Sequence, residues 1–171
     1  MDHVLRLFVG MPDALQPFLA LVPDVRLYAL TRHGTLAVLP FDDALQDALH
    51  RRFGTGQWPA GQRLLLSTTD QSFAADCSAR APLGYVEMLT DDVADLQSAA
   101  VWQHGRLTLG PTTLDLRGTG AGRPKSLWPV NVALRTLGIS AATAGDELSV
   151  FGLADYFANA DIHAHGWPLG A

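Results

Sequence analysis

Cysteine is nearly absent from this 171-residue chain, which has a single example, Cys77. No disulfide can therefore form within the chain, and a lone cysteine cannot build a Cys-x-x-Cys metal site. The low cysteine content is compatible with a reducing, cytoplasmic location. With no base beside it in the sequence, Cys77 is expected to be a small buried apolar residue.

Positive charge is also scarce, with 12 Lys and Arg against 17 Asp and Glu, a net charge of −5. Binding to nucleic acid requires clustered Lys and Arg side chains that neutralise phosphates. Basic residues come close together at Arg51-Arg52 and at Arg123 with Lys125, and neither pair is large enough for such a surface. The charge therefore argues against a nucleic-acid partner and favours a basic protein as partner.

Long hydrophobic runs are missing too, because none approaches the roughly 18 apolar residues of a membrane span. The apolar N-terminal stretch is interrupted by Asp2, Arg6 and Asp13, so neither a signal peptide nor membrane association is expected. The composition, 48% hydrophobic and 17% charged, predicts a sizeable core. No Pro/Gly-rich linker divides the chain, so residues 1–171 are expected to form one domain.

The sequence also lacks the motifs that mark known catalytic and phosphate-binding sites. No Gly-x-Ser-x-Gly sequence is present to support a serine nucleophile. The stretch Gly118–Ser126 is glycine-rich like a phosphate-binding loop, but its spacing is wrong and Pro124 lacks the backbone N–H that such a loop uses. The sequence therefore predicts a protein that is not an enzyme and that has no cofactor.

Two β-hairpins are expected. In the central one, the apolar runs Ser98–Trp102 and Arg106–Leu109 flank His104-Gly105, a pair suited to a tight turn. A second hairpin is predicted from Val25–Thr31 and Thr35–Leu39. The fold class is therefore α+β, a mainly antiparallel sheet built from two hairpins with amphipathic helices packed on one face.

The clearest helix is predicted at Phe41–Phe53, because acidic residues begin it, basic residues end it and Gly54 follows. Its apolar face is formed by residues at the helical spacing, namely Leu45, Ala48, Leu49 and Phe53. The other expected elements are strands at His3–Val9, Arg63–Thr68 and Gly84–Leu89, a short helix within Thr69–Arg80, a mobile loop at Thr112–Lys125 and a helix at Leu127–Leu137.

One internal similarity is present. Thr31–Pro40 and Trp102–Pro111 align without gaps and share His-Gly, a leucine two residues after the glycine, and a final proline. The similarity suggests that residues 1–83 and 84–171 arose by duplication, although short hairpins with similar turns can also converge on such a sequence.

Partner-binding residues are predicted from charge and aromatic character. The acidic run of Asp91, Asp92 and Asp95 is interpreted as a solvated connector or a docking patch for a basic partner. Less in keeping with the sequence, the run together with the nearby Glu87 would form an acid–base pair or a cation site. Trp58 and Trp128 each precede a proline, which places a large ring on an extended backbone. Each could instead cover one end of the core. The predicted contact residues are Asp91, Asp92, Asp95, Trp58, Trp128 and Arg123.

The C-terminal segment contains Asp161, His163 and His165. In a strand these three side chains would point to one side and could converge on a metal ion. The alternative is a solvated tail. This cluster would make the protein a small metal-dependent hydrolase or a small-molecule binder, and it is the second hypothesis for function.

Four segments resemble those of a group of uncharacterised small acidic bacterial proteins. They are Gly84–Glu87, Gln97–Pro111, Asn131–Gly138 and Gly145–Leu153. In size and charge the chain is also similar to immunity proteins of toxin systems, a similarity by association. This resemblance implies a non-enzymatic cytoplasmic protein that neutralises a bacterial toxin by direct binding. A homodimeric structural or accessory protein is the third hypothesis.

Overall fold

The protein is an α+β structure with an antiparallel sheet, as the sequence predicts. The computed structural model describes residues 3–22, 28–29, 36–61, 64–90, 95–140 and 147. The strands are β1 (His3–Gly10), β2 (Tyr28–Ala29), β3 (Ala37–Pro40), β4 (Leu83–Thr90), β5 (Asp95–Gln103) and β6 (Arg106–Asp115). The helices are α1 (Pro12–Leu19), α2 (Asp43–Phe53), α3 (Thr68–Cys77), the 3-10 turn η2 (Lys125–Leu127) and α4 (Pro129–Thr136).

The strands form one sheet in the order β2-β3-β1-β4-β5-β6, and every pairing is antiparallel. The central strand β1 pairs with β4 along its whole length, from His3 opposite Thr90 to Gly10 opposite Leu83. Its pairing with β3 is shorter and stops where Leu7 faces Pro40. On that side of β1, no strand of the described residues pairs with the first three positions of the strand.

The central hairpin is confirmed, with strands longer than predicted. Gln103 pairs with Arg106, which leaves His104 and Gly105 as a two-residue turn. Both turn residues have positive φ, 53° and 75°, which is the geometry that suits the twist of two antiparallel strands. At the other end of the sheet, β2 and β3 pair as the second predicted hairpin requires, and the predicted turn between them lies outside the described residues.

Helix α2 follows its sequence signals closely. The Asp42 side chain accepts a hydrogen bond from the Leu45 N–H at 2.9 Å, and Gly54 ends the helix with φ 86°. Leu45 and Leu49 are fully buried on the predicted apolar face. Phe53, at the end of that face, keeps 51% of its surface exposed.

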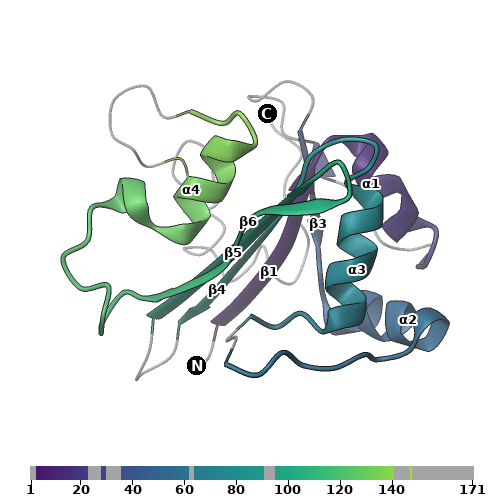
Figure 1. The fold of residues 1–171 in the computed structure, drawn as a ribbon, viewed down its shortest axis with the longest axis horizontal. Helices are drawn as coiled ribbons and strands as arrows, with labels where there is room; N and C mark the ends of the chain where they lie inside the picture. The colour runs from purple at the N-terminus through teal and green to yellow at the C-terminus, as the bar shows by residue number, and fades with distance from the viewer. Residues whose placement is uncertain are drawn as a thin grey trace.

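Helices cover both faces of the sheet, so the expectation of helices on one face is wrong in this respect. Figure 1 shows α1, α2 and α3 on one side of the strands and α4 on the other. The first core, under α1 to α3, is centred on Phe8 and Tyr85, and the second core, under α4, contains Val86, Val101 and Leu134. Strands with helices on both faces are apolar at consecutive positions, as β1 is at Leu7–Val9.

The predicted strand at Arg63–Thr68 is absent from its described part, residues 64–68. Ser67 instead begins α3, because its side chain accepts from the Asp70 N–H and the Asp70 side chain accepts from the Ser67 N–H, a capping box. Leu64 and Leu66 are buried in the first core from an irregular segment. The apolar run therefore reflects burial of a loop, and the helix within Thr69–Arg80 is confirmed one residue earlier than expected.

The predicted loop at Thr112–Lys125 begins later than expected, because β6 continues to Asp115. The Asp115 carboxylate then accepts hydrogen bonds from the backbone N–H groups of Arg117 and Gly118, each at 3.0 Å. The first backbone N–H of the glycine-rich stretch, that of Gly118, is thus bonded to a side chain of the protein itself. This arrangement agrees with the interpretation of Gly118–Ser126 as an ordinary surface loop.

The duplication remains a prediction. The two similar segments place β3, an inner strand, in correspondence with β6, which ends the strand order. If the halves arose by duplication, the second strand of the first hairpin lies inside the sheet, whereas the second strand of the other hairpin lies at its end.

Two buried glutamines differ in a way that predicts a difference in stability. Gln97, on β5, is fully buried, and neither polar atom of its amide has a hydrogen-bond partner among the described residues. Gln46, on α2, is also buried but bonds at both ends of its amide. Because an unpaired buried amide costs free energy, Gln97→Met is expected to raise the free energy of unfolding by about 1–2 kcal/mol.

The measurement is urea denaturation of purified protein, with Gln46→Met as the matched control. That control deletes satisfied hydrogen bonds and is expected to lower the free energy of unfolding by about 1–3 kcal/mol. A loss of stability in Gln97→Met equal to that of the control would contradict the prediction.

Candidate functional site

A groove of about 580 Å³ lies beside the N-terminal half of β1. We call it the Trp58 groove. Its lining residues are Val4, Leu5, Arg6, Pro40, Phe41, Asp42, Asp43, Gln46, Trp58 and Leu65. Three large apolar side chains in this lining are exposed: Trp58 by 52%, Val4 by 43% and Leu65 by 39%. Large apolar groups gathered at one surface hollow are typical of binding sites.

Arg6 contributes the positive charge of the groove lining, and that charge is already paired. Its guanidinium donates to Gln46 Oε1 at 2.8 Å and forms an ion pair with the exposed carboxylate of Asp43. It also lies over the Phe41 ring, 5.7 Å from the ring centroid. Because the charges of Arg6 and Asp43 compensate each other, the charge of Asp42 makes the groove lining negative overall.

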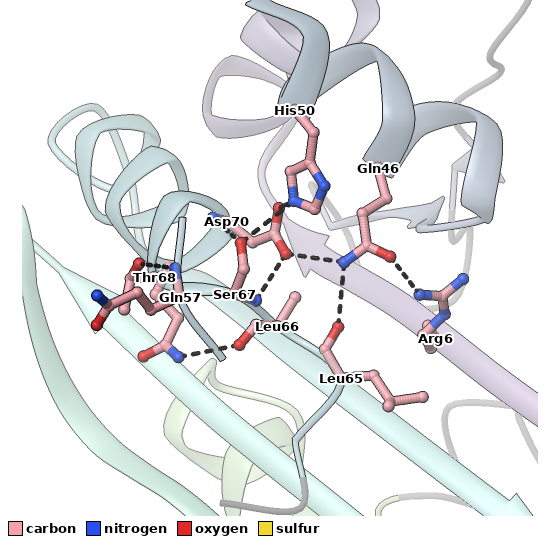
Figure 2. A network of polar contacts seen from close by, with 10 residues as sticks. Arg6, Gln46, His50, Gln57, Leu65, Leu66, Ser67, Thr68 and Asp70 are labelled. Carbon is pink, nitrogen blue, oxygen red and sulfur yellow. Dashed lines mark hydrogen bonds and ion pairs between the residues drawn. The ribbon is translucent and has the colours of Figure 1, made fainter. Parts of the chain in front are cut away.

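Behind the groove, a buried polar network joins α2 to the start of α3 (Figure 2). The Asp70 carboxylate, which is fully buried, accepts from Gln46 Nε2 and from the Ser67 N–H, both at 2.8 Å. Its other oxygen lies 2.8 Å from His50 Nε2. A buried carboxylate needs such donors to offset the loss of its hydration. The network therefore fixes the position of α2 relative to the start of α3.

The presence of Ser67, His50 and Asp70 in one network raises the question of a catalytic triad. In a triad the serine and the acid contact different nitrogens of the histidine. Here Ser67 Oγ, at 3.2 Å, and Asp70 Oδ1, at 2.8 Å, both contact the same atom, His50 Nε2. Ser67 is also fully buried, and its Oγ accepts the Asp70 N–H. The geometry is that of a helix cap.

The loop that carries Trp58 is held to the sheet and to α3 at several points. The Leu65 N–H donates to Glu87 Oε2 at 2.9 Å, and the Leu65 carbonyl accepts from Gln46 Nε2 at 3.3 Å. At the other end of the loop, the Gln57 N–H donates to Thr68 Oγ1 and the Thr68 N–H donates to the Gln57 carbonyl, at 2.9 and 2.8 Å. The residue before Trp58 therefore has a fixed backbone.

Glu87 is a buried acid on β4, exposed by 4%, on the same face of the sheet as Tyr85. Burial raises the pKa of Glu87 above its ordinary value of 4.5. The hydrogen bonds from the Tyr85 hydroxyl, at 2.7 Å, and from the Leu65 N–H, together with the nearby Arg6 charge, act in the opposite direction on this pKa. Burial also raises the pKa of Tyr85, and the Glu87 charge adds to the effect.

The Glu87 carboxyl gives an expected pH dependence. Because its pKa is higher in the folded protein, the protonated form stabilises the fold below pH 4.5, and this stabilisation is lost as the pH rises through the raised pKa. Glu87→Gln keeps an oxygen for Tyr85 and Leu65 without the charge. The melting temperature of Glu87→Gln relative to wild type is therefore expected to increase as the pH rises from 4.5 to neutrality.

Thermal melts across that pH range test this expectation, with Asp47→Asn as the control because Asp47 lies exposed on α2. Parallel curves for wild type and Glu87→Gln would contradict it.

Of the predicted contact residues that the structure describes, Trp58 and Trp128 lie on opposite faces of the sheet. Trp58 lines the groove. Asp95 begins β5 and accepts from Thr90 Oγ1 at 3.2 Å, and Asp91 and Asp92 lie outside the described residues. Trp128 is the N-cap of α4, and Figure 1 shows α4 on the opposite face of the sheet. The Trp128 Nε1 donates to the Arg123 carbonyl at 3.3 Å.

The metal hypothesis falls on residues that the structure does not describe, since Asp161, His163 and His165 are among them. Within the described ranges, no group of three or more His, Cys, Asp or Glu side chains is placed to hold a metal ion. Cys77 is buried, as expected, and burial raises the pKa of its thiol to about 12. Across the same ranges, none of the helices has the length and apolar character that crossing a membrane requires.

Sequence reasoning missed Arg6, Gln46, His50 and Asp70, the polar residues in and behind the groove, and named Glu87 only as a neighbour of the acidic run at Asp91–Asp95. Two signals point to part of this set. The spacing Ser67-x-x-Asp70 is that of a capping box, and Glu87 is a lone charge within the apolar strand Leu83–Leu89. The pairing of Arg6 with α2 has no signal in the sequence, because its partners lie 37 and 40 residues away.

Comparison of the chain with protein-family models, with curated proteins and with solved structures finds no match in any of the three. The α+β fold and the Trp58 groove are therefore the features from which a function can be argued.

Proposed function

We propose that this protein is a non-enzymatic binding module and that the Trp58 groove receives part of a basic partner protein. The observation that carries the proposal is the exposure of Trp58, 52%, over a groove of about 580 Å³. Tryptophan is one of the residue types enriched among the few side chains that dominate the affinity of protein interfaces.

The charge of the site supports a basic partner. Asp42 and Asp43 lie in the groove lining and are exposed, and Asp47 is exposed on the same helix. The chain as a whole carries a net charge of −5. Complementary charge of this kind accelerates association and selects against acidic partners.

The polar groups behind the groove support binding over catalysis. Arg6, Gln46 and Asp70 direct their polar atoms at one another. Such groups hold a surface in shape, whereas catalysis needs a nucleophile, acid or base that faces a substrate. The contacts of Ser67 and His50 with each other and with Asp70 fit the same interpretation.

We propose further that the partner is a bacterial toxin whose basic active cleft the protein blocks, which would make the protein an immunity protein. The small size, the acidic charge and the acidic groove suit that role. Co-expression with the toxin encoded next to its gene is expected to rescue cell growth, and a gene with no toxin neighbour would count against this part of the proposal.

The experiment for the binding function is a comparison of Trp58→Ala with wild type. Removing a hot-spot tryptophan is expected to weaken binding to the native partner by about thirtyfold or more, which corresponds to about 2 kcal/mol. The partner is captured from the native cell, purified, and titrated calorimetrically with each variant.

Phe53→Ala is the matched control, because Phe53 is an aromatic residue exposed by 51% that does not line the groove. Its affinity should equal that of wild type. A purified partner that binds Trp58→Ala as tightly as wild type would refute the proposed site.

A further inference from the structure

Among the described residues, one side of β1 has no neighbouring strand along the Trp58 groove. The strand is paired with β4 over its whole length, but β3 reaches only as far as Leu7. The Phe41 N–H donates to the Arg6 carbonyl at 2.9 Å as the chain leaves the sheet toward α2. Beyond that bond, His3, Val4 and Leu5 have no strand of the described residues on this side.

The backbone direction at Val4 follows from the bond to Arg6. In a strand, the N–H and C=O groups of successive residues point alternately to the two neighbouring strands. Since the Arg6 carbonyl points toward the side of β3, both backbone groups of Val4 point the same way. They lie where an additional strand, continuing the line of β3, would accept and donate hydrogen bonds.

The strand at the end of the sheet order is built differently. β6 contains Pro111, which has no backbone N–H, and proline in an edge strand is a common protection against pairing with another chain. The described part of β1 beside the groove contains no proline, and its residues Val4 and Leu5 line the hollow.

We propose that a basic, extended segment of the partner protein binds as an added strand, antiparallel to β1, in the place that β3 leaves free. This proposal rests on the proposed binding function and specifies its mode. Side chains of the added strand that point to the face of Val4 and Arg6 would contact Trp58 and Leu65. Such strand addition takes affinity from main-chain hydrogen bonds and specificity from alternate side chains.

The negative charge around this edge selects a basic segment as the occupant. Asp42 and Asp43 line the groove at the point where β3 ends. Because Arg6 pairs with Asp43, the charge of Asp42 makes the groove lining negative, and a lysine or arginine of the added strand would complement it.

The test uses a phage-displayed library of random dodecapeptides selected on the whole protein. Selected peptides are expected to alternate apolar residues with Lys or Arg. Val4→Pro removes the backbone N–H that points toward the added strand and leaves the hydrogen bonds between β1 and β4 in place. This substitution is expected to weaken the binding of the selected peptides about tenfold. Val4→Thr keeps the N–H in a β-branched residue and should bind as wild type does.

The outcomes separate this inference from the proposed function. Peptides that depend on Trp58 but bind Val4→Pro as tightly as wild type would overturn strand addition and leave groove binding intact. Peptides that bind Trp58→Ala normally would overturn both. N-methylation of the peptide residue opposite Val4 gives the same test without changing the protein, and undiminished binding would overturn the inference.

Hydrogen exchange of the free protein adds an independent readout. The Val4 amide is expected to exchange fast in the free protein and to become protected by the peptide. A Val4 amide already protected in the free protein would mean that a second copy or another part of the chain occupies the edge, which would also overturn the inference.

Discussion

Replacing Asp70 by alanine is expected to lower the free energy of unfolding by about 3–5 kcal/mol. The carboxylate is fully buried and is contacted at 2.8 Å by Gln46, His50 and the Ser67 N–H. Alanine would leave these groups without their partner in a place that water reaches poorly, and each unpaired buried group costs about 1–3 kcal/mol. It would also remove half of the capping box that begins α3.

Urea denaturation measures this loss, and Asp76→Ala is the matched control. Asp76 lies on the same helix but is exposed, so its replacement is expected to change stability by less than about 0.5 kcal/mol. Equal effects of the two substitutions would mean that the network contributes nothing beyond the helix itself.

Replacing Phe8 by alanine is expected to cost about 3–5 kcal/mol, because a buried ring is lost and a cavity remains. Phe8 is fully buried at the centre of the first core. Its ring centroid lies 4.5 Å from that of Phe18, 5.0 Å from Phe41 and 5.2 Å from Tyr85. These tilted and edge-on contacts add to the stability that burial of the ring supplies.

The same denaturation experiment tests Phe8, with Phe53→Ala as the exposed aromatic control. Phe8→Leu keeps most of the volume and is expected to lose less than half as much stability as Phe8→Ala. A Phe8→Ala variant as stable as Phe53→Ala would show that the aromatic cluster is not the centre of the core.

Elements whose signals are local could be predicted from the sequence. Asp42 and Gly54 mark the ends of α2, and His104-Gly105 marks the central turn, because each acts within a few residues of its own position. The predicted strand at Arg63–Thr68 failed because a run of leucines indicates burial without indicating which element provides it.

The candidate site was harder to predict, since its contacts join distant parts of the chain. Trp58 was predicted from its aromatic ring and the proline that follows it. The partners that define its surroundings, Arg6 with Gln46 and Gln46 with Asp70, are 40 and 24 residues apart, and nothing local in the sequence records such pairs. The placement of α4 on the second face depends in the same way on tertiary packing, although the consecutive apolar residues of β1 are a signal for it.

The hydrogen bonds that hold Leu65 and Gln57 bear on the thermodynamics of the proposed partner binding. Association normally loses conformational entropy when a loop becomes ordered at an interface. Here the bonds of Leu65 with Glu87 and Gln46, and of Gln57 with Thr68, fix the backbone on either side of Trp58 in the free protein. If Trp58 binds a partner as proposed, the cost of ordering this backbone would be met during folding, and more of the contact energy would remain available as affinity.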